Sequence, residues 1–163
     1  MISYQYSKRI LKKAIIKIND EDIKSTNSLN RIVSKNVYST INYPSGDNAA
    51  FDGYAINSRD TKNIEKGLSK KFKIIGLIAA GNKPFKKKIK KYDTVEIMTG
   101  GIIPKGFDTI IPIEQIIFFP HKQNKKYILI DGKKTKYNHV RFAGSDFKKK
   151  EIVVKKNTII QPN

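Results

Sequence analysis

The sequence predicts an α+β protein that is mostly β. One amphipathic helix near the N-terminus is followed, from Tyr43 onward, by short apolar and β-branched runs that alternate with Gly, Pro and Asn. That alternation is typical of a small antiparallel barrel or sandwich. The 163 residues suffice for one ordinary domain or two small ones, so a large multi-domain enzyme does not fit within them.

The amphipathic helix is predicted from residue 2 to residue 18. Apolar side chains recur there at three- and four-residue spacing, and basic side chains occupy the other side. Ser3 is a suitable N-cap, and Asn19-Asp20 is a suitable stop. A second, short helix is predicted from Leu29 to Asn36, after a cluster of Ser, Thr and Asn. We expect both apolar stripes to pack in a core or against a partner helix.

Six strands are predicted between turn-forming residues, in the ranges 54–57, 72–79, 94–98, 109–113, 116–119 and 127–130. Pro112 and Pro120 lie within or beside two of these runs. Because proline cannot donate to a β-ladder, we expect those strands to be sheet edges or to begin at a bulge. The last pair of apolar runs, 151–154 and 158–160, is predicted to form a hairpin.

The chain is strongly basic, with 33 basic residues, 14 acidic residues and a formal net charge of +19. Such a surplus is typical of proteins that bind nucleic acids, anionic lipids or anionic substrates. Only four of the basic residues are Arg, the residue that contacts phosphates and bases bidentately, and the rest are Lys. We therefore interpret the lysine runs at 86–88, 90–91 and 148–150 as solvated loops and sheet edges rather than as a binding patch.

Composition also bears on disulfides, metal sites and membrane segments. The chain has no Cys, which excludes a disulfide framework and a thiolate metal site. Basic residues interrupt the apolar positions of the N-terminal segment, and no later run approaches the length of a membrane span. We expect a cytoplasmic protein with no membrane partner and no specific nucleic-acid partner.

Three stretches carry residues from which chemistry can be argued, and the first is PSGDNAAFDGYA. Its Asp-Asn and Asp-Gly pairs favour turns, and the small residues between them allow the backbone to approach another group closely. Asp52 stands beside the apolar ring of Phe51. A carboxylate so placed can hold a metal ion, orient a water or repel an anion. The alternative is that both aspartates cap local turns.

The second stretch, 97–106, contains Thr99-Gly100-Gly101 directly after a predicted strand. Its two glycines are free to adopt positive φ, and backbone N–H groups exposed in such a turn form a concave nest suited to an oxyanion. A hairpin loop without a ligand is the alternative. The third stretch, 138–147, has an Arg-x-x-Gly-x-Asp spacing that indicates a salt bridge and a turn. We interpret His121 and His139 as surface histidines.

Taken in order, DNAAFDGYA, IMTGGIIPKGFDTIIPIEQ and VRFAGSDFKKKEIVV resemble the first half of the molybdopterin molybdotransferases, the family of bacterial MoeA and the gephyrin E-domain. The family patterns are Asp-Asn-Ser-Ala-Met-Asp-Gly-Tyr-Ala, then Ile-Met-Thr-Gly-Ala with a following Glu, then Arg-x-x-Gly-x-Asp. Order and spacing agree over essentially the whole chain. Ala49, Phe51 and Gly101 stand where the family has Ser, Met and Ala.

The resemblance implies two domains. An elongated helix-plus-strand domain, built from residues 1–43 plus 138–163, flanks a small antiparallel β-barrel-like domain of residues 44–137. The complete protein would be an enzyme that inserts molybdate into adenylylated molybdopterin and releases AMP, with Mg²⁺ assisting. The pterin-binding Gly-Gly-x-Ser-x-Gly loop of the family does not occur in these 163 residues, so we expect the chain to be inactive alone.

The resemblance also implies site residues and partners. Asp52 and Thr99 match the positions that the family links to activity, and Asp52 is a candidate Mg²⁺ ligand. Further matched positions, expected to bind substrate, are Asp47, Asn48, Gly53, Gly100 and Glu114. A homodimer is implied for the full-length protein, with molybdopterin adenylyltransferase as an upstream partner. Two alternatives stay open: a non-catalytic dimerisation or scaffold module, and a basic RNA-binding β domain.

Overall fold

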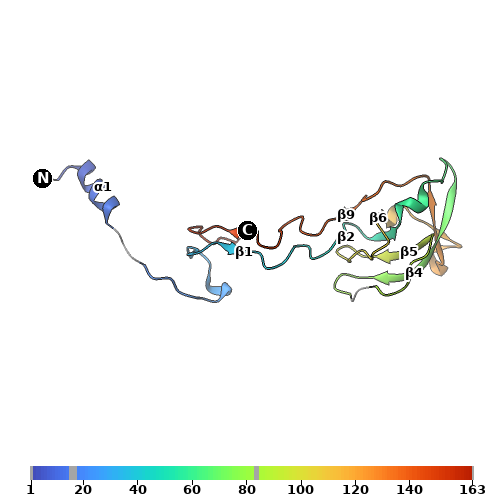
Figure 1. Ribbon diagram of the computed structural model, residues 1–163, viewed down its shortest axis with the longest axis horizontal. Coiled ribbons are helices and arrows are strands. Elements are labelled where there is room, and N and C mark those ends of the chain that lie inside the picture. The colour runs from blue at the N-terminus through green and yellow to red at the C-terminus, as the bar shows by residue number, and fades with distance from the viewer. Residues whose placement is uncertain (1, 15–17, 83–84, 163) are drawn as a thin grey trace. The chain divides into compact units, whose positions relative to one another are not determined.

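The computed structural model describes residues 2–14, 18–82 and 85–162. Contacts divide the chain into a terminal unit, Met1–Val37 with Ile152–Asn163, and a central unit, Tyr38–Glu151. Each unit is described by itself, and their elements are labelled in Figure 1. The predicted domain boundaries at residues 43 and 138 stay a prediction.

The helix of the terminal unit is α1 (Tyr4–Lys13). Ser3 caps it as predicted, because its hydroxyl oxygen accepts a hydrogen bond from the Tyr6 N–H at 3.3 Å. The helix is shorter than predicted: Ala14 is already extended, with a ψ of 108°, and residues 15–17 lie outside the described part of the chain. No residue of α1 is buried, so the tertiary packing that stabilises most helices does not act on it.

The prediction of a second helix at 29–36 is wrong. The 3₁₀ turn η1 (Ser25–Asn27) comes first, and Ile32 then pairs with Ile159 in an antiparallel bridge. Two backbone bonds of 2.9 Å flank this bridge, from the Val33 N–H to the Thr158 oxygen and from the Ile160 N–H to the Arg31 oxygen. The β-branched side chains suit this pairing, and a partner distant in sequence decides the local structure.

The predicted C-terminal hairpin is also wrong. Strand β10 (Ile152–Val154) pairs with β1 (Val37–Tyr38), while Ile159 takes Ile32 as its partner. The two C-terminal segments thus pair with segments from the N-terminal part of the chain rather than with each other. Residues 155–158 still form a turn, closed by the Thr158 N–H and the Lys155 oxygen at 3.2 Å.

The central unit contains a curled six-stranded sheet of order β6-β3-β5-β4-β8-β7 (Figure 1). Its strands confirm the six predicted runs: β3 (Gly53–Ile56), β4 (Ser69–Ile78), β5 (Asp93–Ile97), β6 (Thr109–Pro112), β7 (Ile117–Phe119) and β8 (Tyr127–Asp131). The sheet is mixed rather than antiparallel, because β4 and β5 run parallel. Pro112 lies in β6 and Pro120 directly follows β7, and these are the two edge strands, as predicted.

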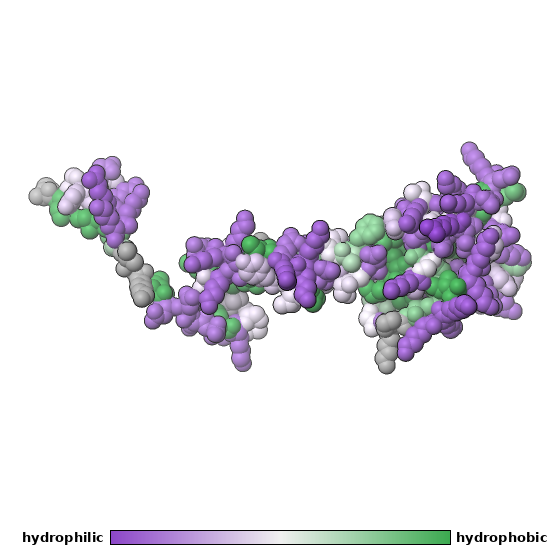
Figure 2. All heavy atoms as spheres, in the orientation of Figure 1, coloured by the Kyte–Doolittle hydropathy of each residue, from purple (hydrophilic) through white to green (hydrophobic). Residues whose placement is uncertain are grey.

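Two buried clusters lie on opposite faces of this sheet, since successive side chains of a strand point to opposite sides. Tyr54 and Ile56 of β3 join one cluster with Phe72, whereas Ala55 joins the other with Val95. On the face seen in Figure 2, hydrophobic side chains gather on the central unit and hydrophilic ones surround them. No helix in the described ranges is long and apolar enough to cross a membrane.

The remaining elements are short. Strands β2 (Asn48–Ala49) and β9 (Val140–Arg141) pair with each other in a separate two-stranded sheet. The 3₁₀ turns are η2 (Ser58–Thr61), η3 (Ile113–Gln115) and η4 (Lys122–Asn124). They connect the strands of the central unit.

The pairing of β3 with β6 yields a stability prediction. A Cβ atom added at Gly53 would lie 2.1 Å from the backbone oxygen of Ile111, so the two strands would have to separate. We expect Gly53→Ala to lower the free energy of unfolding in urea by about 3 kcal/mol. Gly46→Ala is the control, because its Cβ would meet only the Ile102 side chain, at 3.4 Å, and we expect a change within about 0.5 kcal/mol. Equal stability of the two variants would contradict this account.

Candidate active site

The backbone of Asp47–Ala50 brings the three predicted stretches together. On one side, the Ala49 N–H donates to the Gly101 oxygen at 3.0 Å, and the Gly100 N–H donates to the Ala49 oxygen at 2.9 Å. On the other side, β2 pairs with β9, which belongs to the third stretch. Ala49 is 1% exposed, so a small apolar residue fits between the two neighbouring segments. The first stretch is therefore the middle strand between the other two.

Asp47 links all three stretches through its own atoms. Its backbone oxygen accepts from the Ile103 N–H at 2.9 Å, and its side-chain Oδ1 accepts from the Ala143 N–H at 2.9 Å. A carboxylate that accepts a backbone N–H fixes the turn to which that N–H belongs. Asp47 thus has a structural role in this site.

Asp52 and Thr99, the two predicted catalytic residues, contact each other directly. The Thr99 hydroxyl and the Thr99 N–H each donate to Asp52 Oδ1 at 2.7 Å. The hydroxyl bond, and after it the backbone bond, lowers the pKa of the Asp52 carboxyl, because both bonds stabilise its ionised form. Within the described residues, Asp52 Oδ2 has no hydrogen-bond donor, and the residue is exposed. One carboxylate oxygen is therefore free to meet a cation or a water.

The predicted oxyanion nest at 99–101 is wrong. Gly100 does adopt a positive φ of 78°, but the N–H groups of the turn already have acceptors inside the protein. The Thr99 N–H bonds to Asp52, the Gly100 N–H bonds to Ala49 and the Gly101 N–H bonds to Met98. The first stretch supplies two of these acceptors, Asp52 and Ala49. Residues 99–101 alone do not reveal this contact between distant segments. This part of the site presents acceptors rather than donors.

Three further predicted residues lie around Asp52. Gly53 is buried between Ile97 of β5 and Pro112 of β6. The Asp52 backbone oxygen accepts from the Ile113 N–H at 3.0 Å, and Glu114, the next residue, is exposed in η3. These contacts fix where Gly53 and Glu114 lie, and a substrate-binding role for them stays a prediction, as it does for Gly100.

Asn48 is the predicted site residue with an unpaired buried atom. The residue is 7% exposed, and its side-chain Oδ1 is buried with no hydrogen-bond partner in the described part of the chain. A buried carbonyl oxygen that lacks a donor is destabilising unless a water or a ligand supplies one. A donor at this atom would fit the predicted substrate-binding role.

The third stretch forms the predicted salt bridge and turn. The Arg141 guanidinium donates to Asp146 and lowers the pKa of that carboxyl. Gly144 has a φ of 70°, and its N–H bonds to the Pro44 oxygen at 2.9 Å. The turn is therefore attached to the start of the first stretch.

Sequence reasoning missed one contact of the site, between Phe51 and His139. Their rings lie edge to face, with centroids 5.0 Å apart and an interplanar angle of 89°. The His139 backbone oxygen also accepts from the Ala50 N–H at 3.0 Å. The only available signal was the pair Asn138-His139, since Asn and His are among the residues enriched in left-handed backbone.

The site residues fit a metal ion that is held by one carboxylate, not one that is enclosed by several protein ligands. Within the described ranges, no group of three or more His, Asp or Glu side chains is placed to hold a metal ion. Mg²⁺ is commonly bound by one or two carboxylates together with waters and substrate phosphates. Asp52, ionised and with a free oxygen, suits that mode.

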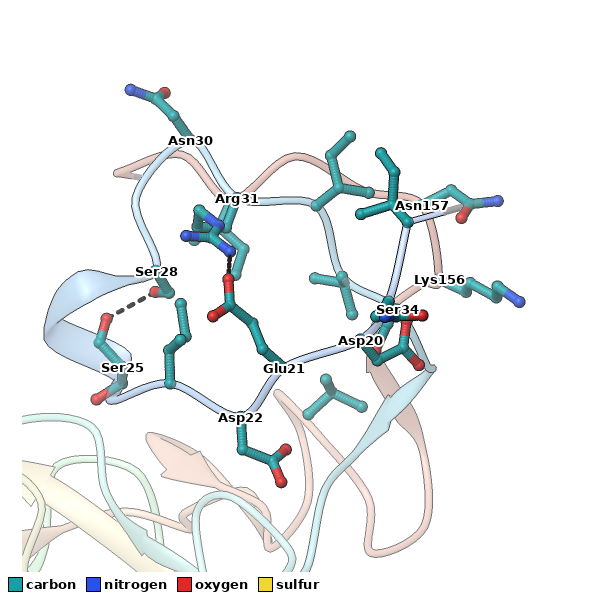
Figure 3. Close-up of a pocket in the computed structure, with 17 residues that line it drawn as sticks. Asp20, Glu21, Asp22, Ser25, Ser28, Asn30, Arg31, Ser34, Lys156 and Asn157 are labelled. Carbon is teal, nitrogen blue, oxygen red and sulfur yellow. Dashed lines mark hydrogen bonds and ion pairs between the residues drawn. The ribbon is translucent and has the colours of Figure 1, made fainter. Parts of the chain in front are cut away.

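A cavity of about 760 Å³ lies within the terminal unit (Figure 3). Its lining combines apolar side chains with Asp20, Glu21 and Asp22, and Glu21 forms an ion pair with Arg31. None of the predicted site residues lines it, because all of them belong to the central unit.

Comparison with known proteins accounts for the three stretches together. The family model of the MoeA N-terminal region (domain I and II) matches residues 2–163. The chain belongs to this family. This match confirms the resemblance that the three motifs indicated.

Relatives of this MoeA region are named as enzymes. The molybdopterin molybdenumtransferase of Haemophilus influenzae is 34% identical over 134 residues, covering 82% of this chain and 30% of the relative. That of Staphylococcus aureus strain Mu50 is 30% identical over 135 residues, covering 83% and 31%. The crystal structure of the molybdopterin biosynthesis moeA protein from Pyrococcus horikoshii OT3 matches with a TM-score of 0.86 and 27% identity, covering 99% and 41%. The chain spans about a third of the length of the curated relatives.

The Asp52–Thr99 contact predicts that the stability of the folded protein depends on pH. Because the pKa of Asp52 in the folded protein is lowered, the contact favours folding above the unfolded-state pKa, and this contribution is lost as the pH falls through the folded-state pKa. We expect Thr99→Ala to raise the pKa of the Asp52 carboxyl, measured by NMR titration, since the hydroxyl donor is removed. Thr99→Ser keeps that donor and should leave the pKa unchanged. An equal pKa in the alanine variant would refute the assigned cause.

The structural role of Asp47 is tested by two substitutions. Asp47→Ala removes the acceptor of the Ala143 N–H, and we expect it to lower the free energy of unfolding by about 1 kcal/mol. Asp47→Asn keeps an oxygen acceptor and should preserve most of the stability. If the two variants are equally stable in urea, the bond to Ala143 does not hold the site together.

Proposed function

We propose that the chain is the N-terminal part of a molybdopterin molybdotransferase, which inserts molybdate into adenylylated molybdopterin and releases AMP. Membership of the MoeA family and the names of the relatives support molybdenum cofactor biosynthesis as the setting. The observation that carries the proposal is the contact between Asp52 and Thr99, which joins the two motifs that the resemblance links to activity.

Asp52 would act as the charged group of the site. Thr99 orients the carboxylate and stabilises its ionised form, while Oδ2 stays free for a ligand. Thr99 is a positioning residue in this proposal, because its hydroxyl and its N–H are both occupied by Asp52. The neighbouring Gly53 holds Asp52 at the start of β3 by its close approach to β6.

Mg²⁺ would be held by Asp52 Oδ2. When bound, it would supply positive charge to the phosphate oxygens of the adenylylated substrate. The site has acceptors rather than donors at this point, so a cation between the carboxylate and a phosphate matches its chemistry. Asn48 would contribute its unpaired Oδ1 to a substrate or water donor.

Partners and the chain's own competence are proposals as well. We expect the 163 residues alone to show no turnover, because the pterin-binding loop implied by the family is not in their sequence. A homodimer is the proposed assembly of the full-length protein, with molybdopterin adenylyltransferase supplying its substrate. A scaffold role is the second candidate, and the observation that favours it is α1, whose apolar side chains Tyr6, Ile10 and Leu11 are exposed.

The decisive substitution is Asp52→Asn in the protein expressed from its complete gene. We expect AMP release from adenylylated molybdopterin to fall by about 100-fold or more, because the carboxylate charge is lost while the shape is kept. Asp131→Asn is the matched control, since Asp131 is also an exposed carboxylate with a pKa lowered by a hydrogen bond, from Lys134. Full turnover by the Asp52→Asn variant would contradict the proposed role of the Asp52 carboxylate.

A further inference from the structure

The Glu96–Lys125 ion pair joins two segments of the central unit that are distant in the sequence. Lys125 Nζ donates to both carboxylate oxygens of Glu96, at 2.8 and 2.7 Å. The Lys125 and Glu96 side chains are 36% and 15% exposed, so water screens this pair less than a fully exposed one. Glu96 lies in β5, whereas Lys125 directly follows η4 in the connection from β7 to β8. The pair therefore links that connection to an inner strand of the sheet.

A buried tyrosine lies beside this ion pair. Tyr54 is paired with Glu96 in the β3–β5 ladder and is fully buried. Within the described part of the chain, its hydroxyl has no aligned hydrogen-bond partner. Burial, and after it the charge of Glu96, raises the pKa of this hydroxyl, while Lys125 opposes the rise. A phenol between a carboxylate and an ammonium can donate to one and accept from the other, so the three groups form one polar cluster.

The same cluster closes the curled sheet. Phe118 belongs to the edge strand β7, which β5, β4 and β8 separate from β3 in the order of the sheet. Its ring nevertheless meets the Tyr54 ring edge to face, with centroids 5.9 Å apart. Lys125 Nζ lies 5.7 Å from the centre of the Phe118 ring. The contacts of Phe118 and Lys125 therefore bring the end of the sheet back to β3.

The candidate site lies at the ends of the two strands that this cluster joins. Asp52 directly precedes β3, and Thr99 lies two residues after the last residue of β5. The two hydrogen bonds from Thr99 to Asp52 thus join the ends of β3 and β5. Their geometry depends on how these strands are held together, and Tyr54 and Glu96 are a paired position of the same ladder.

We propose that Lys125 and Glu96 are positioning residues of the candidate site. Their ion pair, beside the Tyr54 hydroxyl, holds β3 and β5 in the arrangement in which Asp52 meets Thr99. Neither residue acts on the substrate itself. This inference rests on the proposed function, because the position of Asp52 matters for turnover only if its carboxylate is the charged group of the site.

The first test is an NMR titration of the Asp52 carboxyl in the 163-residue chain with Glu96→Met. This substitution keeps the length of the side chain and removes its negative charge, which by electrostatics alone would lower the Asp52 pKa. We expect the opposite, a pKa raised toward that of the Thr99→Ala variant, because the bonds from Thr99 loosen. Lys134→Met is the matched control, since it breaks the ion pair with Asp131 in the same unit and should leave the Asp52 pKa unchanged.

The second test is turnover by the protein expressed from its complete gene. We expect Lys125→Met to lower kcat about tenfold with little change in KM, because a misplaced group slows the chemical step even where substrate binding is kept. Lys125→Arg keeps the cation and should retain most of kcat. Lys134→Met is again the control and should turn over normally.

Two outcomes would overturn the inference. One is an Asp52 pKa that is unchanged or lowered in Glu96→Met. The other is an equal kcat of Lys125→Met and Lys125→Arg in a protein that Asp52→Asn inactivates. The titration separates this inference from the proposed function, because it does not depend on turnover. If Asp52→Asn retains full turnover while Glu96→Met raises the Asp52 pKa, only the proposed function fails.

Discussion

The candidate site depends on one constraint: the short strand β2 is hydrogen-bonded on both sides. Gly100 and Gly101 bond to its Ala49 from one neighbouring segment, and β9 pairs with it from the other. These segments are far apart in the sequence, so the site exists only when all three are in place. Ala49 at the centre is buried, which is consistent with a small side chain in this part of the first stretch.

The electrostatics of the site run opposite to those of the whole chain. The protein carries a net charge of +19. In the turn of residues 99–101, however, the N–H groups bond to acceptors inside the fold, and one carboxylate oxygen of Asp52 stays free. In the proposed function, the global charge would favour the approach of an anionic substrate, whereas the local carboxylate would need a cation before a phosphate could come close. The sign of the site charge could not be inferred from the net charge of the chain.

Local patterns predicted the elements whose causes are local. β-branched runs identified the six strands of the central sheet, the two prolines identified its edges, and Ser3 identified the start of α1. The prediction of a helix at 29–36 was wrong because the apolar spacing fits a helix, whereas Ile159 pairs with Ile32 as in a strand. The prediction of an oxyanion nest failed for the same reason, since two of its three N–H groups bond to residues that lie about 50 positions away. The ordered motifs predicted that Asp52 and Thr99 belong to one site, but not that they touch.

Hydrogen exchange of the Thr99, Ile103 and Ala143 amides tests the central claim most directly. Each of these N–H groups bonds to Asp47 or Asp52, and together they report whether the three stretches are assembled. The account predicts that all three exchange more slowly than the Lys105 amide, which has no acceptor in the described part of the chain, and that they do so in the 163-residue chain without any ligand. Exchange at the rate of Lys105 would mean that the site is not formed by this fold, and the account would be contradicted.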